Sequence, residues 1–179
     1  MKRSNKLTLA LTAGAVAVLA GTALYAAQDK YALVSPGGIK FADFKGYEGW
    51  SVVSSARQED VLKVIVGNPI IIAAYKSGIP GNGKPFPEGS KLAKLQWKPK
   101  KSTEAPFVVD VPDVFAQAFL MEKDSKRFPK TGGWGYAVFN YDAKSDGFTP
   151  DAASLADCGH TCHVAVKAKD YVFHPYQKR

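Results

Sequence analysis

Both cysteines of this chain lie in one short stretch near the C-terminus, at Cys158 and Cys162, and His163 follows the second directly. Two cysteines this close in sequence cannot connect distant parts of a fold, so the core must form without a disulfide framework. Residues four apart share one face of a helix, so both thiols and the imidazole can contact a single bound group. The order Cys, Cys, His is that of a haem c attachment site, in which two thiols add to the haem vinyl groups and the histidine ligates the iron.

The spacing differs from the usual attachment site, because three residues separate the cysteines here instead of two. Two other uses of these groups therefore stay open. A disulfide between Cys158 and Cys162 is sterically allowed, since helical Cα atoms at this spacing are about 6 Å apart. A zinc site from both cysteines, His160 and His163 has suitable ligand types, although ligands so close in sequence do not easily form a tetrahedron. We favour one covalently attached haem c, with His163 as the metal ligand.

The N-terminal segment has the layout of an export signal. Three basic residues precede an uncharged run of about 22 residues, from Leu7 to Gln28, which is rich in Leu, Ala and Val. We predict that residues 1–27 form a signal peptide, or an N-terminal membrane anchor if they are not removed, and that residues 28–179 form one periplasmic domain. Export favours haem c over free thiols, because oxidising compartments leave few thiols unmodified.

The basic charge of the chain is too modest to indicate a nucleic-acid partner. The formal charge is +8, and it falls to +5 without the three basic residues of the leader. Lys98, Lys100 and Lys101 form one basic cluster beside Pro99, which we interpret as a solvated loop. The same cluster is a candidate docking site for a soluble redox partner.

Alternating and β-branched runs predict a mainly antiparallel sheet with a few helices, hence a single-domain α+β fold. Strands are expected at 50–53, 61–66, 90–97, 107–111 and 135–141, and the run 114–123 fits either a strand or a helix. Short helices are expected at 70–77, where Gly78 follows, and at 154–166. The segment 79–89 holds three prolines and three glycines and is expected to be a loop.

With His163 as the proximal ligand, the group on the opposite side of the iron separates electron carriers from gas binders and catalysts. After the leader, the remaining Met and His candidates are Met121, His160 and His174. Met121 lies in an apolar run, which favours a place in the core. His160 lies inside the attachment motif and cannot reach the opposite face of the haem, and His174 is interpreted as a surface or rim residue. We therefore predict an open distal site.

Four short motifs follow one another along the chain. They are Tyr47-Glu48-Gly49-Trp50, Lys126-Arg127-Phe128, Gly132-Gly133-Trp134-Gly135-Tyr136, and the cysteine cluster followed by Lys169-Asp170-Tyr171-Val172-Phe173. In this order they resemble the cytochrome P460 family. The resemblance implies a small exported haem c protein with a mainly antiparallel β fold that forms a homodimer. The family includes enzymes that oxidise hydroxylamine and nitric oxide, and cytochromes c′-β that bind gases, so a small gaseous or nitrogenous ligand is implied.

The resemblance also points to a lysine. In the P460 enzymes a lysine bonded to a haem meso carbon lies in a strand shortly after a loop of the form Phe-Xaa-acidic-Gly. Phe86-Pro87-Glu88-Gly89 matches that loop, and the family spacing then leads to Lys94. Lys94 is thus the candidate for a haem cross-link, with an exposed strand lysine as the alternative. By the same comparison Lys63 falls where the enzymes carry a distal arginine, which makes it a weaker candidate.

The distal carboxylate that the P460 enzymes are thought to use in proton transfer has no counterpart here. Its position, counted back from Arg127-Phe128, falls on Phe119, and Phe115 lies nearby. The nearest acids, Asp113 and Glu122, are out of register. A phenylalanine over the iron would exclude water and bulky ligands while admitting small gases, so we expect Phe119 and Phe115 to contact the haem; ordinary core packing is the alternative.

Three functions are compatible with these residues. The first is a haem c protein of the c′-β type that binds NO or a similar small ligand at an open distal site. The second is a P460-type oxidoreductase of hydroxylamine or NO that carries a cross-link through Lys94. The third is an electron-transfer cytochrome with Met121 as the sixth iron ligand.

Overall fold

The computed structural model describes residues 28–154 and 156–177, without the side chains of residues 156–158. The predicted leader, residues 1–27, lies outside the described residues, as does the side chain of Cys158. Within the described part of the chain, no helix is long and apolar enough to cross a membrane.

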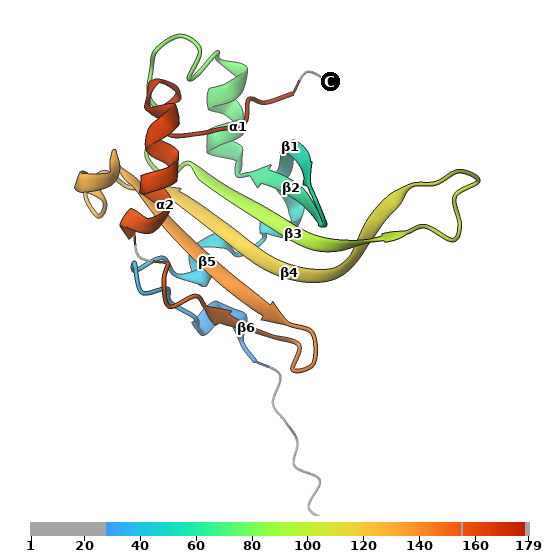
Figure 1. Cartoon of the computed structure of the whole chain (residues 1–179). Coiled ribbons are helices and arrows are strands. Elements are labelled where there is room, and N and C mark those ends of the chain that lie inside the picture. Colours follow the sequence, from blue (N-terminus) through green and yellow to red (C-terminus); the bar gives the residue numbers. More distant parts are fainter. Residues whose placement is uncertain (1–27, 155, 178–179) are drawn as a thin grey trace, which may run out of the picture.

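Six antiparallel strands form one sheet, and each strand pairs with the next along the chain (Figure 1). The predicted α+β fold with a mainly antiparallel sheet is thereby confirmed. Short connections join β1 to β2 and β5 to β6, as antiparallel neighbours allow, whereas residues 68–90, which include a helix, join β2 to β3. The strands are β1 (Ser51–Gln58), β2 (Val61–Gly67), β3 (Lys91–Lys101), β4 (Asp110–Lys123), β5 (Trp134–Asp142) and β6 (Gly147–Pro150).

Two α-helices and several short 3₁₀ turns accompany the sheet in the described chain. Helix α1 (Pro69–Lys76) begins where Asn68 accepts a hydrogen bond from the backbone N–H of Ile71, with Pro69 in the first turn. Helix α2 (Ala156–His163) carries the cysteine motif. The 3₁₀ turns are Lys30–Ala32, Phe41–Phe44, Tyr47–Gly49, Pro129–Thr131 and Val164–Lys169.

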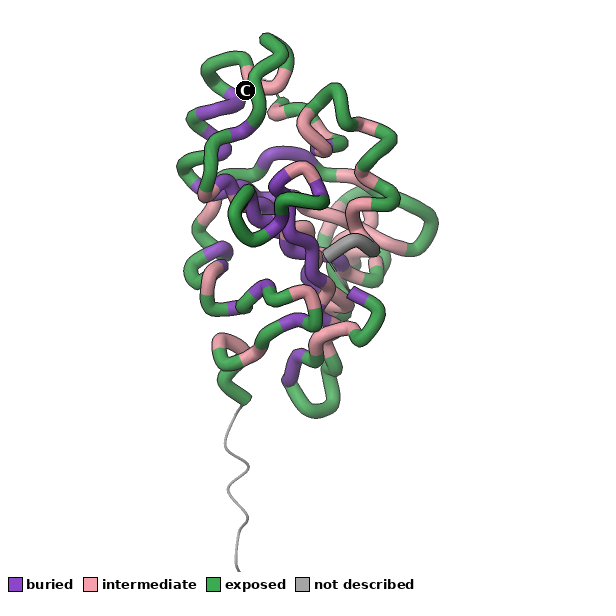
Figure 2. Tube along the Cα trace, turned by 90° about the vertical axis from the view of Figure 1, so that its left-hand side faces the viewer, coloured by how far each residue is buried: buried purple, intermediate pink, exposed green. Residues whose placement is uncertain are grey.

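The two faces of the sheet carry separate hydrophobic cores. One face packs against the N-terminal segment, where Phe41 and Phe44 are fully buried beside Phe139 of β5. The other face packs against α1, α2 and the C-terminal segment, with Ile71 and Trp134 fully buried. Buried residues therefore run through the middle of the molecule, between these two coverings (Figure 2).

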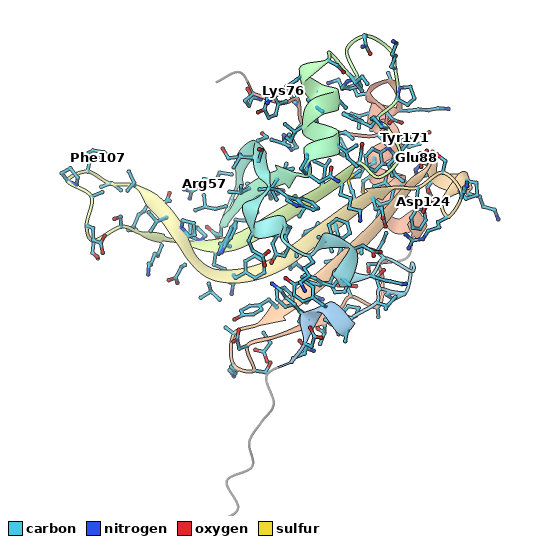
Figure 3. All side chains as sticks on the ribbon, turned by 180° about the vertical axis from the view of Figure 1, so that it is seen from behind. Arg57, Lys76, Glu88, Phe107, Asp124 and Tyr171 are labelled. Atoms are coloured by element: carbon cyan, nitrogen blue, oxygen red, sulfur yellow. The ribbon has the colours of Figure 1, made fainter. Side chains whose placement is uncertain are left out.

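The prediction of a solvated lysine loop at 98–101 is wrong. Strand β3 continues to Lys101 because its backbone stays paired with β4. Ion pairs of Lys100 with Asp113 and of Lys101 with Asp110 accompany this pairing. Beyond the pairings with β2 and β5, β3 and β4 continue as a two-stranded arm, residues 98–116. Phe107, at its tip, is 69% exposed (Figure 3).

The helix predicted at 154–166 is shorter than expected. Helix α2 ends at His163, and a 3₁₀ turn follows over Val164–Lys169 with non-helical angles at Val166. The β-branched side chains of Val164 and Val166 contribute to this change, since they lose rotamer freedom in a helix. The α-helical turns therefore hold the cysteine motif itself, and the 3₁₀ turn leads the chain back toward the sheet.

Candidate functional site

A cavity of about 310 Å³ lies on the face of the sheet that α1 and α2 cover. Its walls come from β1 to β5, from α1 and α2, and from the C-terminal segment. This volume falls within the usual range for small-molecule sites in proteins. The cavity brings together Lys94, Phe119, Cys162 and His163, four of the residues selected from the sequence.

Strand register creates the floor of the cavity. Lys94 of β3 stands opposite Ile65 of β2 and Phe119 of β4, and Phe119 stands opposite Val138 of β5. Directly opposed residues point to the same face of a sheet, so this row of side chains faces the cavity together. A second row, two residues along each strand, consists of Leu92, Met121 and Tyr136.

The one basic side chain in this floor is half-buried. Lys94 Nζ lies 3.8 Å from the centre of the Phe119 ring, within the range of a cation–π contact. Burial, together with the nearby charge of Lys63, lowers the pKa of Lys94 to about 8. A substantial fraction of Lys94 is therefore a neutral amine near pH 8, and a neutral amine can act as a nucleophile.

Helix α2 contributes a thiol and an imidazole to the cavity. Cys162 carries a free, exposed thiol at the cavity wall. The ring of the half-buried His163 packs against Tyr136 and Phe173, with ring centres 5.0 and 4.7 Å away. At Gly159 the helix approaches β5 so closely that an added Cβ would lie 2.5 Å from Tyr136 Cβ. This contact sets how near the cysteine motif comes to the sheet.

A backbone carbonyl fixes the His163 imidazole. His163 Nδ1 lies 2.6 Å from the carbonyl oxygen of Tyr171, and since a carbonyl can only accept, Nδ1 must carry the proton. The lone pair of Nε2 is then free to bind a metal, which is the usual arrangement of an iron- or zinc-bound histidine. Burial lowers the pKa of His163, so the neutral form that a metal needs prevails.

The residues around the cavity fit a haem. The lining is mostly apolar, as a porphyrin requires, and it includes the His163 imidazole, one thiol and an amine. The buried hydroxyl of Tyr136, also in the lining, has no hydrogen-bond partner among the described residues. A group without a partner at a cavity wall suits a polar ligand atom. No three His, Cys, Asp or Glu side chains form a metal cluster within the described residues, which exclude the side chain of Cys158.

The family model of Cytochrome P460 matches residues 44–174. The chain belongs to the cytochrome P460 family. The match extends from Phe44, where the second 3₁₀ turn ends, to His174, so it includes the sheet, both helices and the cavity. Membership in the cytochrome P460 family implies haem c. No curated protein matches the chain.

Some residues selected by resemblance to cytochrome P460 do not reach the cavity. Phe115 lies on the opposite face, because a register shift between Gln96 and Trp97 gives β4 an extra residue there, and its ring packs on Trp97, Tyr141 and Phe148. Lys63 is on the cavity face one row beyond Lys94 and donates a hydrogen bond to Gln58.

The acids considered as distal bases also lie elsewhere. Glu122 is buried on the far face of the sheet, where it forms ion pairs with Lys91 and Arg127. Asp113 belongs to the arm and forms an ion pair with Lys100. Neither carboxylate lines the cavity.

Several cavity residues have no site role that the sequence indicates. Met121 packs against the core, as its apolar run predicts, and it also lines the cavity; the half-buried His174, interpreted as a surface or rim residue, contributes to the cavity wall. The hydroxyl of Tyr75 in α1 donates to the carbonyl oxygen of His174 at 2.9 Å, which ties the C-terminal segment to this wall. In the sequence, Tyr136 stands out only as the last residue of a glycine-rich motif. Strand parity within 135–141 separates Tyr136 from Ala137 and Phe139, and was the only available signal for it.

Proposed function

We propose that this protein is an exported haem c protein that binds NO, or a ligand of similar size, at an open distal site. Cys158 and Cys162 attach the haem and His163 ligates its iron. When bound, haem supplies an iron atom with one position open to a diatomic gas. The observation that carries the proposal is an apolar cavity that joins His163 and Cys162 to Phe119 and is lined by no described carboxylate.

Different residues of the chain orient the histidine and shape the ligand site. The Tyr171 carbonyl holds the proton on His163 Nδ1 and directs Nε2 to the metal. Phe119 and Val138 present hydrocarbon to the site, which excludes water and disfavours bulky or charged ligands. No carboxylate among the described lining residues is placed to accept the protons that hydroxylamine oxidation releases, and the basic groups there besides His163 are Lys94 and His174.

Titration of the purified ferrous holoprotein with NO and CO, followed by optical spectroscopy, tests this function. We expect saturable binding of both gases and little turnover of hydroxylamine. A low-spin spectrum that neither gas changes would instead select the electron-transfer function with Met121 as a ligand. Rapid hydroxylamine oxidation would contradict the gas-binding proposal.

A second candidate function is a P460-type oxidoreductase of hydroxylamine or NO with a cross-link from Lys94 to haem. It is supported by the half-buried position of Lys94 in the cavity floor and by its pKa of about 8. The two functions predict different optical spectra of the ferrous protein. A cross-linked protein keeps a red-shifted ferrous Soret band that Lys94→Ala removes, whereas the gas binder has an ordinary high-spin ferrous spectrum.

We also propose a periplasmic location, a homodimer, and a soluble redox partner if the protein turns over. Fractionation of cells with N-terminal sequencing tests export and distinguishes a cleaved leader from a membrane anchor. Light scattering of the purified protein tests the dimer, and a monomer at all concentrations would contradict it.

A further inference from the structure

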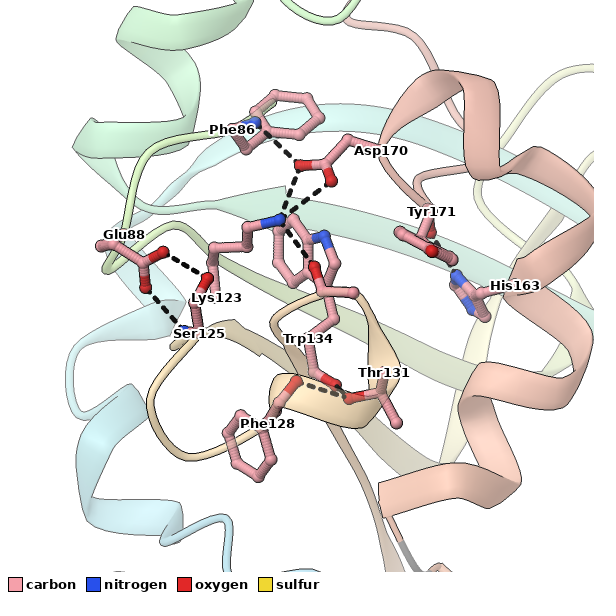
Figure 4. A network of polar contacts seen from close by, with 11 residues as sticks. Phe86, Glu88, Lys123, Ser125, Phe128, Thr131, Trp134, His163, Asp170 and Tyr171 are labelled. Carbon is pink, nitrogen blue, oxygen red and sulfur yellow. Dashed lines mark hydrogen bonds and ion pairs between the residues drawn. The ribbon is translucent and has the colours of Figure 1, made fainter. Parts of the chain in front are cut away.

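A buried ion pair lies beside Tyr171, the residue whose carbonyl contacts the histidine of the motif (Figure 4). Lys123, the last residue of β4, is 5% exposed, and its Nζ donates to Asp170 Oδ1 at 2.9 Å, Asp170 Oδ2 at 3.1 Å and the Gly132 carbonyl oxygen at 2.9 Å. Asp170 Oδ2 also accepts from the backbone N–H of Phe86 at 2.8 Å. Both charges are therefore compensated, as buried ions require.

The ion pair holds a turn of unusual backbone conformation. Asp170 and Tyr171 have positive φ values of 48° and 63°, a region that residues other than glycine seldom adopt. Two such residues in succession persist only where their surroundings fix them. Lys123 fixes Asp170 by donating hydrogen bonds to the Asp170 carboxylate. Gly132 fixes the second, because an added Cβ there would lie 2.1 Å from Tyr171 Cε2, so the ring rests directly on the glycine.

This turn aims the carbonyl group that His163 uses. Tyr171 directs its carbonyl oxygen to His163 Nδ1 at 2.6 Å, while its own N–H donates to the Val166 carbonyl at 3.2 Å. The contacts thus run without interruption from Lys123 through Asp170 and Tyr171 to His163. Buried ion pairs add little net stability compared with apolar replacements, so a role in geometry accounts better for this one.

We propose that Lys123 and Asp170 are positioning residues that keep the Tyr171 carbonyl on His163 Nδ1 and so set the orientation and donor strength of Nε2. This inference rests on the proposed function, since it takes His163 as the iron ligand. A strong Nδ1–H···O bond gives the imidazole more anionic character, which strengthens its bond to iron and favours the ferric state. Weakening the ion pair therefore changes a property of the iron without touching any residue of the cavity floor.

The variants are Asp170→Asn, Lys123→Met and the two combined. Asn tolerates positive φ and keeps an acceptor for Phe86, so Asp170→Asn removes charge with little change in shape. The double variant leaves no unpaired buried charge, which keeps the test available if a single variant does not fold. Lys91→Met is the matched control, because Lys91 forms a partly buried ion pair with Glu122 at 3.3 Å on the opposite face of the sheet.

The measurements are the iron–histidine stretching frequency of the ferrous holoprotein by resonance Raman spectroscopy and its midpoint potential. We expect a lower frequency and a more positive potential in all three variants, and wild-type values in Lys91→Met. Wild-type frequency and potential in folded Asp170→Asn and in the double variant would overturn the inference.

The full chain purified without haem provides an independent readout. Nitrogen-15 NMR of His163 is expected to show Nδ1–H as the dominant tautomer in the wild type and a mixture of tautomers in the variants. If the wild type binds no haem, the proposed function fails while this comparison still tests the positioning role. An unchanged tautomer in the variants would contradict that role even where haem attaches.

Discussion

The ammonium group of Lys94 lies 3.8 Å from the centre of the Phe119 ring, across directly opposed positions of β3 and β4. The two residues were selected from the sequence for different reasons, one as a cross-link candidate and the other as the replacement of a distal acid. Their contact places an amine of lowered pKa and an aromatic ring at the same point of the cavity floor. A carboxylate at position 119 would instead form an ion pair with Lys94 and keep it charged.

The pH dependence of stability reports the state of Lys94. Its pKa is about 8 in the folded chain against an ordinary 10.5, so between these values the unfolded state binds more protons. We expect Lys94 to add a rise with pH to the free energy of unfolding of the haem-free chain across this window, and Lys94→Met to lose that contribution. Urea unfolding at several pH values measures it. Lys98→Met, an exposed lysine of the arm, is the control, and an equal loss in that variant would contradict the assignment.

Replacing Phe119 by alanine is expected to widen the range of ligands. The smaller side chain opens the cavity floor, so imidazole should bind the holoprotein about tenfold more tightly relative to CO. Phe115→Ala is the matched control, because it removes a phenyl ring from the same strand on the opposite face. Optical titration of both variants gives the ratio. Equal effects of the two substitutions would show that Phe119 does not face the ligand.

The close contact of Gly159 with Tyr136 predicts a stability effect. An added Cβ would lie 2.5 Å from Tyr136 Cβ, so Gly159→Ala must displace α2 from β5 and should destabilise the chain by about 1–3 kcal/mol despite the better helix propensity of alanine. Gly49→Ala is the control, since nothing lies within 4 Å of an added Cβ there. Thermal unfolding compares them, and an unchanged transition in Gly159→Ala would count against the packing described.

Asn68 anchors α1 above the cavity. Its Oδ1 accepts from the N–H groups of Ile71 and Lys91, each at 3.1 Å, and its Nδ2 donates to the Gly89 carbonyl at 2.8 Å. Asn68→Ala leaves these buried groups without partners and should cost about 1–3 kcal/mol. Asn82→Ala, in an exposed loop, should cost much less. Chemical denaturation measures the difference, which must favour Asn82→Ala if the cap has this role.

The regular elements of the fold were largely predictable. β-Branched and alternating runs identified β2 and β5, and the apolar run before Gly78 identified α1 to within a residue at each end. Strand β6 was missed because it has only four residues and ends in Pro150, which gives no usable periodicity. The extension of β3 was missed because Pro99 and its lysines are typical of loops, whereas ion pairs across the arm support a strand.

Parts of the candidate site depended on information that no local pattern carries. Phe115 lies on the face opposite to the predicted one because of a one-residue register shift in β4. A shift of this size reverses the facing of every side chain beyond it. The contact between His163 and the Tyr171 carbonyl involves a backbone group, which has no sequence signature. The ion pair of Lys123 with Asp170 joins residues that are far apart in the chain, so only the folded structure could reveal it.

The central claim is that Cys158, Cys162 and His163 bind one haem c covalently. Its most direct test is the intact mass of the protein matured in a host with haem c export machinery, measured together with the ferrous optical spectrum. We predict the mass of the processed chain plus one haem, and the loss of full covalent attachment in Cys158→Ala and in Cys162→Ala. A chain without haem, or haem fully retained in either cysteine variant, would contradict the claim.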